Sequence, residues 1–215
     1  MRSIKDNNLV QAWLVLLLSI IFSCTLAAVH LNLGPIIEEN KTKETMDNIP
    51  VLVTGKSSST LDDNPFQISQ RILNIDKNGI IKSYMVYDAL DKTGNTAGHV
   101  VKASGQGYGD RIELLLGLDP EGKTITGLFI LEHKETPGLG DKITEDEWRN
   151  QYVGKYSDSS LVVIKGKSVN DNEIDAISGA TISSRAVTDI INGTIADVKS
   201  KLMISPESGN NMENN

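Results

Sequence analysis

Hydroxyl side chains gather in one short stretch near the C-terminal end of the chain. Residues 175–187 read DAISGATISSRAV, with Thr181 among Ser178, Ser183 and Ser184. Apolar residues then recur at spacings of three and four, which predicts an amphipathic helix that begins at Ser183 or Ser184. The ordinary interpretation of this stretch is helix capping. A phosphate on Thr181 would also be stabilised there, because unpaired N–H groups and the positive end of the helix dipole would face it.

Two more stretches contain more glycine than a plain scaffold requires. Residues 104–109 read SGQGYG, in which the glycines permit close approach of the backbone to a ligand and Tyr108 offers a flat ring. The spacing is not that of a dinucleotide-binding loop. Residues 133–140 read HKETPGLG, in which Pro-Gly forces an exposed bend that can present N–H groups to a ligand. Taken alone, each stretch is equally a connecting loop.

The elements that would position these stretches form a strand-rich body. Turn residues at 76–79 and 119–122 predict two β-hairpins. Thr144 and Glu147 have the spacing of a capping box, which predicts a short helix anchored by Trp148. Together these signals predict an α+β fold built on an antiparallel sheet with flanking helices. The expected strands are residues 71–75, 80–87, 97–104, 113–118, 123–132 and 161–164.

An apolar run stands at the N-terminus. Residues 9–31 contain no Asp, Glu, Lys or Arg, and as a helix these 23 residues would span roughly 34 Å, enough to cross a membrane. Arg2 and Lys5 precede the run, whereas Glu38 and Glu39 follow it. The positive-inside rule then predicts a cytoplasmic N-terminus and a main domain on the extracytoplasmic side.

Two alternatives to a retained transmembrane helix are a signal peptide cut near residues 25–27 and a lipoprotein signal at Cys24. The run is longer than a signal core of about 7–15 residues, which favours the anchor. The predicted organisation is a cytoplasmic N-terminus at 1–8, a transmembrane helix at 9–33, a linker at 34–60, the main domain at 61–204 and a disordered tail at 205–215.

The composition argues against two other classes of function. The chain has 21 Lys and Arg against 28 Asp and Glu, a net charge of −7, without any Lys/Arg-rich run, so it is a poor candidate for binding nucleic acid. One cysteine and three widely spaced histidines leave no zinc-type spacing and no intrachain disulfide. We therefore expect no metal site.

Residues 175–181, DAISGAT, resemble the flavinylation signal Asp-x-x-Ser/Thr-Gly-Ala-Thr. With the apolar N-terminal run, GQGYG and HKETPGLGDK in the same order, the chain resembles the G subunit of the Rnf electron-transport complex nearly end to end. The C subunit of the sodium-pumping NADH:quinone reductase has a related FMN-binding domain. The resemblance implies that Thr181 carries FMN through a phosphodiester bond and that a flavin transferase recognises Asp175.

The resemblance also implies the rest of the site. Ser178, Gly179 and Ala180 would give the FMN access to the Thr181 hydroxyl. The residues implied at the isoalloxazine are Glu135, Thr136, Leu139 and Gly140, with Gly107 and Tyr108 approaching from another side.

As a whole, the resemblance implies an electron carrier without a substrate site of its own, anchored in membrane lipid beside the other membrane subunits of an ion-translocating ferredoxin:NAD+ oxidoreductase. Two alternatives stay open. One is the C subunit of the sodium-pumping reductase, which is usually a longer chain. The other is a cofactor-free extracytoplasmic binding module, in which the hydroxyl cluster is only a helix cap.

Overall fold

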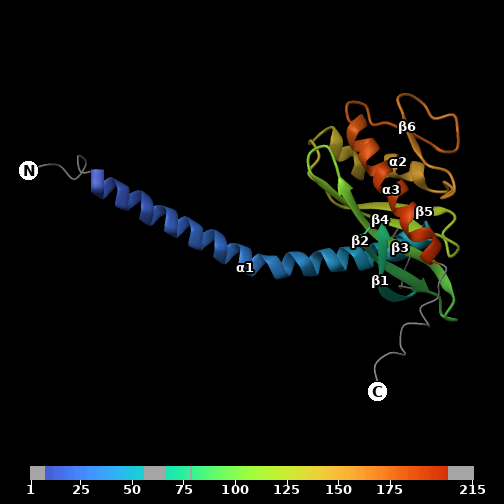
Figure 1. The fold of residues 1–215 in the computed structure, drawn as a ribbon, viewed down its shortest axis with the longest axis horizontal. Coiled ribbons are helices and arrows are strands. Elements are labelled where there is room, and N and C mark those ends of the chain that lie inside the picture. Colours follow the sequence, from blue (N-terminus) through green and yellow to red (C-terminus); the bar gives the residue numbers. More distant parts are fainter. Residues whose placement is uncertain (1–7, 56–65, 78, 203–215) are drawn as a thin grey trace, which may run out of the picture. The chain divides into compact units, whose positions relative to one another are not determined.

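The computed structural model describes residues 8–55, 66–77 and 79–202, with side chains described from residue 11 onward. The chain divides into two compact units, Met1–Glu44 and Thr45–Asn215. The described residues of the first unit are helical, and the second unit contains the sheet (Figure 1).

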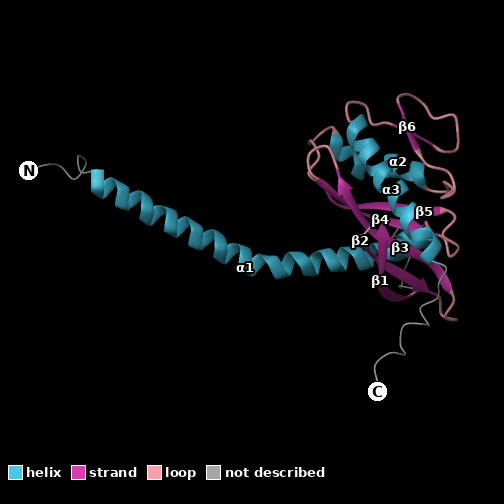
Figure 2. Cartoon of the chain, in the orientation of Figure 1, coloured by secondary structure: helices cyan, strands magenta, loops and turns pink. Residues whose placement is uncertain are grey.

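Five antiparallel strands form the main sheet in the order β1-β2-β3-β4-β5 (Figure 2). Gly79 and Gly122 close the two expected hairpins with φ angles of +83° and +63°, a conformation that glycine adopts without strain. The predicted α+β fold on an antiparallel sheet is confirmed. The strands are β1 Gln67–Lys77, β2 Ile80–Leu90, β3 Thr96–Gln106, β4 Arg111–Leu118 and β5 Ile125–Glu132.

The two faces of the sheet pack against different elements. On β4, Ile112, Leu114 and Leu116 belong to one buried cluster, and Leu115 between them belongs to another, as the alternation of side chains along a strand requires. The first cluster includes the buried face of α3 (Thr181–Leu202), together with Trp148 of the short helix α2 (Asp146–Arg149). Helix α3 therefore packs on the face that carries most of the core.

The second cluster contains the end of helix α1 (Asn8–Thr54). Ile49, Leu52 and Val53 are buried on the sheet. Gly117 and Gly127 make room for them, because an added Cβ would lie 2.6 Å from the Leu52 carbonyl oxygen and 2.7 Å from Leu52 Cδ2, respectively. The linker expected at 34–60 is therefore wrong over residues 34–54, which are helical. Its polar composition conceals an apolar stripe that the sheet buries.

The N-terminal part of α1 covers the helix that we expected at 9–33. It is long and apolar enough to cross a membrane, and its apolar stretch is fully exposed. Two of its hydroxyls are satisfied within the helix: Ser19 and Thr25 donate hydrogen bonds to the carbonyls of Val15 and Ile21 at 2.9 and 2.8 Å. The expected tail at 205–215 lies outside the described residues.

The predicted capping box is wrong. A 3₁₀-helix, η3 (Gly140–Thr144), precedes α2, and the N-cap of α2 is Glu145, without a side-chain cap. Thr144 instead donates a hydrogen bond to the carbonyl of Asp141 at 2.8 Å. A second 3₁₀-helix, η4 (Asn150–Tyr152), follows α2. Trp148 is buried as expected, with 6% of its surface exposed.

A buried charged cluster joins β1, β2 and β3 at the end of α3. The Asp88 carboxylate contacts His99 Nδ1 at 2.5 Å and Arg71 Nε at 2.8 Å. Arg71 also donates to the Leu202 carbonyl at 3.2 Å. Burial by itself would raise the pKa of Asp88, but the hydrogen bond with His99 and the charge of Arg71 outweigh burial and lower it.

We expect Asp88→Asn to lower the free energy of unfolding at pH 7 by about 3 kcal/mol, because it breaks a buried charge pair. The pKa of Asp88 is lower in the folded chain than in the unfolded chain, so its stabilising effect exists above about pH 4 and is lost as the pH falls through the folded-state pKa. Urea unfolding at several pH values should show the gap between wild type and variant narrowing in acid. A gap that stays constant down to pH 3 would contradict this assignment. Glu121→Gln, at an exposed pair, is the control.

Candidate functional site

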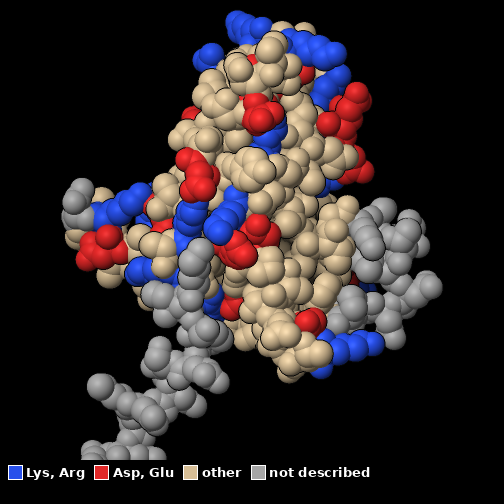
Figure 3. All heavy atoms as spheres, turned by 90° about the vertical axis from the view of Figure 1, so that its right-hand side faces the viewer, with Lys and Arg blue, Asp and Glu red and all other residues tan. Residues whose placement is uncertain are grey.

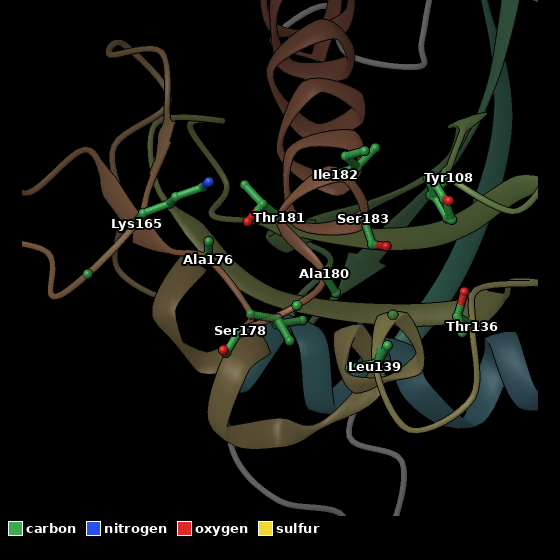
Figure 4. Close-up of a pocket in the computed structure, with 14 residues that line it drawn as sticks. Tyr108, Thr136, Leu139, Lys165, Ala176, Ser178, Ala180, Thr181, Ile182 and Ser183 are labelled. Carbon is green, nitrogen blue, oxygen red and sulfur yellow. The ribbon is translucent and has the colours of Figure 1, made fainter.

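The three stretches singled out in the sequence meet at the N-terminal end of α3. They enclose an open cavity of about 730 Å³ (Figure 4). Tyr108 comes from the first stretch, Thr136 and Leu139 from the second, and Ser178 and Thr181 from the third. Segments more than 70 residues apart in the sequence thus form one site.

Glu135 joins the three stretches from behind the cavity. Only 4% of its surface is exposed. Its Oε1 accepts hydrogen bonds from the backbone N–H groups of Tyr108 and Gly109 at 2.8 and 3.2 Å, and its Oε2 accepts one from the Ser183 hydroxyl at 2.6 Å. The carboxylate therefore supports the cavity wall, and Glu135 is not among the lining residues.

Two of the glycines are required by this carboxylate. A Cβ added to Gly107 would lie 2.3 Å from Glu135 Oε1, and one added to Gly140 would lie 2.9 Å from Glu135 Cβ. The sequence suggested that the glycines of GQGYG leave room for a ligand. At Gly107, the room is taken by Glu135.

Helix α3 begins at Thr181, two to three residues before the predicted start. Ser183 and Ser184 are buried inside the first turn and are not caps, because Ser183 binds Glu135. The Ser184 hydroxyl donates to the Ala180 carbonyl at 3.0 Å and accepts from the Ile177 N–H at 3.0 Å. Thr181 is therefore itself part of the positively polarised end of the helix.

The hydroxyl of Thr181 differs from its two neighbours. Those of Ser183 and Ser184 are both engaged in hydrogen bonds, whereas that of Thr181 has no partner within the described part of the chain. Before it, Gly179 has a φ of +81°, and an added Cβ there would lie 3.0 Å from Leu139 Cδ2. This turn leaves Thr181 half-buried at the edge of the cavity.

Asp175 lies at the end of strand β7 (Glu173–Asp175), outside the cavity lining. Its Oδ1 accepts a hydrogen bond from the Ser168 N–H at 2.5 Å. Its backbone carbonyl accepts one from Trp148 Nε1 at 2.9 Å, and its N–H donates to Gln151 Oε1 at 2.7 Å. In this structure Asp175 fixes the stretch that leads to Thr181.

Strand β7 pairs in parallel with β6 (Val162–Ile164), in register Ile164 with Asp175. Parallel strands bring their carboxyl ends to the same edge, so Lys165, directly after β6, lies beside the residues that follow β7. The sequence predicts a strand near β6 but not β7, and nothing in it indicates that Lys165 lies at the cavity. Three polar-flanked residues make too short a pattern to identify a strand.

The site matches the needs of FMN. Leu139, Ile182 and Tyr108 supply exposed apolar surface for a flat ring, whereas Lys165 and the start of α3 supply positive charge for a phosphate. The volume is within the range of about 300–1,000 Å³ that is usual for cofactor pockets. The expected residues that line the cavity are Tyr108, Thr136, Leu139, Gly140, Ser178, Gly179, Ala180 and Thr181; those that the sequence interpretation missed are Lys165, Gly166, Ala176, Ile177, Ile182 and Ser183.

Sequence comparison relates the chain to flavin proteins. Residues 107–196 match the FMN-binding domain family. The chain is 40% identical over 112 residues to the G subunit of the ion-translocating oxidoreductase complex of Methanosarcina acetivorans, covering 52% of this chain and 56% of that protein. It is 43% identical over 110 residues to the G subunit of the proton-translocating ferredoxin:NAD+ oxidoreductase complex of Clostridium ljungdahlii, covering 51% and 58%. The alignments thus span little more than half of these relatives.

The fold has a solved counterpart. The structure of the C subunit of the Na+-translocating NADH-quinone reductase from Parabacteroides distasonis matches with a TM-score of 0.56 and 22% identity, covering 79% of this chain and 96% of that one. This likeness shows the fold alone. The motifs, the cavity and the alignments agree: residues 107–196 match the FMN-binding domain family, and the resemblance of the chain to the G subunit of the Rnf complex is confirmed.

Proposed function

We propose that this chain is a membrane-anchored flavoprotein subunit that relays electrons within an ion-translocating ferredoxin:NAD+ oxidoreductase complex. Its FMN is held by a phosphodiester bond to Thr181. The observation that carries the covalent assignment is the unpaired Thr181 hydroxyl, which ends the DAISGAT signal and faces a cavity of cofactor size. The sequence similarity to the G subunits of such complexes supports the assignment to the complex.

The residues of the chain have separate roles in this proposal. Thr181 holds the cofactor covalently, while Ser178, Gly179 and Ala180 keep the approach to its hydroxyl open. Tyr108, Thr136 and Leu139, which line the cavity (Figure 4), contact the ring together with Gly140. Glu135 supports this wall by accepting the Tyr108 N–H. FMN supplies one- and two-electron chemistry, which the protein positions. A covalent tether prevents loss of the carrier between electron transfers.

The proposal implies three kinds of partner. The other membrane subunits of the complex donate and accept electrons, and membrane lipid surrounds the apolar part of α1. A flavin transferase installs the FMN and recognises the sequence around Asp175. Asp175 is half-buried and its Oδ1 accepts the Ser168 N–H, so a flavin transferase that binds this oxygen would replace that hydrogen bond.

The covalent assignment can be tested by mass spectrometry of the full chain expressed with a flavin transferase. We expect an adduct with the mass of FMN minus water, localised by peptide fragmentation to Thr181. An unmodified chain, or an adduct on Ser178, would refute the assignment.

We further propose that the FMN domain lies on the extracytoplasmic side of the membrane, because Arg2 and Lys5 precede the apolar helix and Glu38 and Glu39 follow its apolar part. A reporter that is active only outside the cytoplasm, fused after Leu202, is expected to be active. A reporter that is active only inside the cytoplasm serves as the matched control. Its activity at the same position would show that the domain lies on the cytoplasmic side and would contradict the proposed orientation.

A further inference from the structure

We propose that Lys165 is the cationic anchor for the phosphodiester of the FMN on Thr181. This inference rests on the function proposed above and adds a residue that neither the motif nor the resemblance indicates. Lys165 is a positioning residue: it binds the phosphate and thereby fixes where the rest of the cofactor starts.

The parallel pairing of β6 and β7 places Lys165 at the site. Ile164 is in register with Asp175, so the chain leaves both strands at the same edge, one segment continuing to Lys165 and the other to the turn before Thr181. Both residues line the same cavity. Figure 4 shows the Lys165 ammonium directed toward Thr181, with Tyr108 on the opposite side of the cavity.

The charges around the cavity single out this side chain. Among the described residues that line it, Lys165 is the only charged one. Lys165 has no ion pair or hydrogen bond within the described part of the chain, whereas Lys134 is paired with Asp110 at 2.7 Å. Figure 3 shows Lys and Arg side chains gathered at the upper end of the face, where the β6 segment lies in Figure 1.

The chemistry of a phosphodiester fits this arrangement. It carries one negative charge shared by two unesterified oxygens, and the ammonium of Lys165 can donate several hydrogen bonds to them. The N–H groups of Thr181, Ile182 and Ser183, at the start of α3, precede the first hydrogen bond of the helix and can donate to the same oxygens. With the phosphate at the Lys165 end, the Tyr108 and Leu139 end of the cavity is left for the ring.

The test uses the full chain, loaded by a flavin transferase and solubilised in detergent. Intact mass first establishes that the wild type carries the adduct. Phosphorus NMR then compares the phosphodiester resonance in Lys165→Met, Lys165→Arg and Lys167→Met. Lys167 is the matched control, because it is an exposed cation two residues away that does not line the cavity.

We expect Lys165→Met to displace the resonance by more than its line width, and Lys165→Arg and Lys167→Met to leave it close to the wild-type position. Raising the salt concentration should move the wild-type resonance toward that of Lys165→Met, since exposed ion pairs are screened by salt. The Lys165→Met resonance should be insensitive to salt. A Lys165→Met chain that folds but accumulates without FMN, while Lys165→Arg is loaded, would also support the anchor.

The contrary results are distinct from one another. If the wild type carries no adduct, mass spectrometry alone refutes the proposed function, and the anchor falls with it. If the adduct is present and the Lys165→Met resonance coincides with that of the wild type, the anchor is refuted while the proposed function stands. An equal displacement of the resonance by Lys167→Met would also refute the anchor. The displacement would then come from the loss of any positive charge on this surface and not from a contact of Lys165 with the phosphate.

Discussion

Thr181→Val is expected to abolish the covalent flavin completely while leaving the fold intact. Valine has nearly the shape of threonine but no oxygen, so no bond to phosphorus can form. The Thr181 hydroxyl makes no hydrogen bond within the described residues, and its side chain is half-exposed. Its removal should therefore change the free energy of unfolding by no more than about 1 kcal/mol. Intact mass and flavin absorbance of the denatured chain measure the loss.

Ser178→Ala is the control for this loss. Ser178 lines the same cavity and is exposed, so it is the alternative hydroxyl for attachment. We expect this variant to retain the adduct in full. Flavin retained covalently by Thr181→Val, or lost in Ser178→Ala alone, would place the attachment elsewhere.

Glu135→Ala is expected to lower the free energy of unfolding by about 3 kcal/mol and to reduce flavin loading. The substitution removes the acceptor of three hydrogen bonds, the buried one from the Ser183 hydroxyl and the two partly buried ones from the N–H groups of Tyr108 and Gly109. The two glycine-rich stretches and the first turn of α3 then lose their common contact. Urea unfolding and the fraction of chain carrying the adduct measure the two effects.

Glu135→Gln separates hydrogen bonding from charge. Its carbonyl oxygen can accept from both backbone N–H groups, and its amide can donate to Ser183. We expect most of the stability and loading to return. If Glu135→Gln were as damaging as Glu135→Ala, the carboxylate would have a role beyond these three bonds.

The features that the sequence predicts well are those with a local physical cause. The hairpin turns at 76–79 and 119–122 depend on residues adjacent in the chain, and β4 and β5 follow from long apolar runs. The amphipathic spacing of α3 was sufficient to identify that helix, although its start was misplaced. The three motifs stand out because their residue types are unusual for connecting loops, and the structure brings them to one cavity.

The features that cannot be predicted from the sequence depend on tertiary contacts. In the sequence, Lys165 is indistinguishable from other loop lysines, and only the parallel pairing of β6 and β7 places it at the cavity. Ser183 and Ser184 have the composition of caps, but burial against Glu135 and Ile177 gives them other partners. The helical end of α1 contains Pro50 and many polar residues, so its helical state depends on burial of Ile49 and Leu52 by the sheet.

The glycines opposite Leu52 set a limit on how the protein can be divided. A soluble fragment cut at residue 61, where the sequence places the start of the domain, would lack Ile49, Leu52 and Val53 and would leave their strip of the sheet open to water. Such a fragment would tend to aggregate through that strip. A truncation made just before Thr45 retains the whole second unit. Residues 45–54, at the end of α1, thus also belong to the core of the domain. The domain needs them for its stability even where no membrane is present.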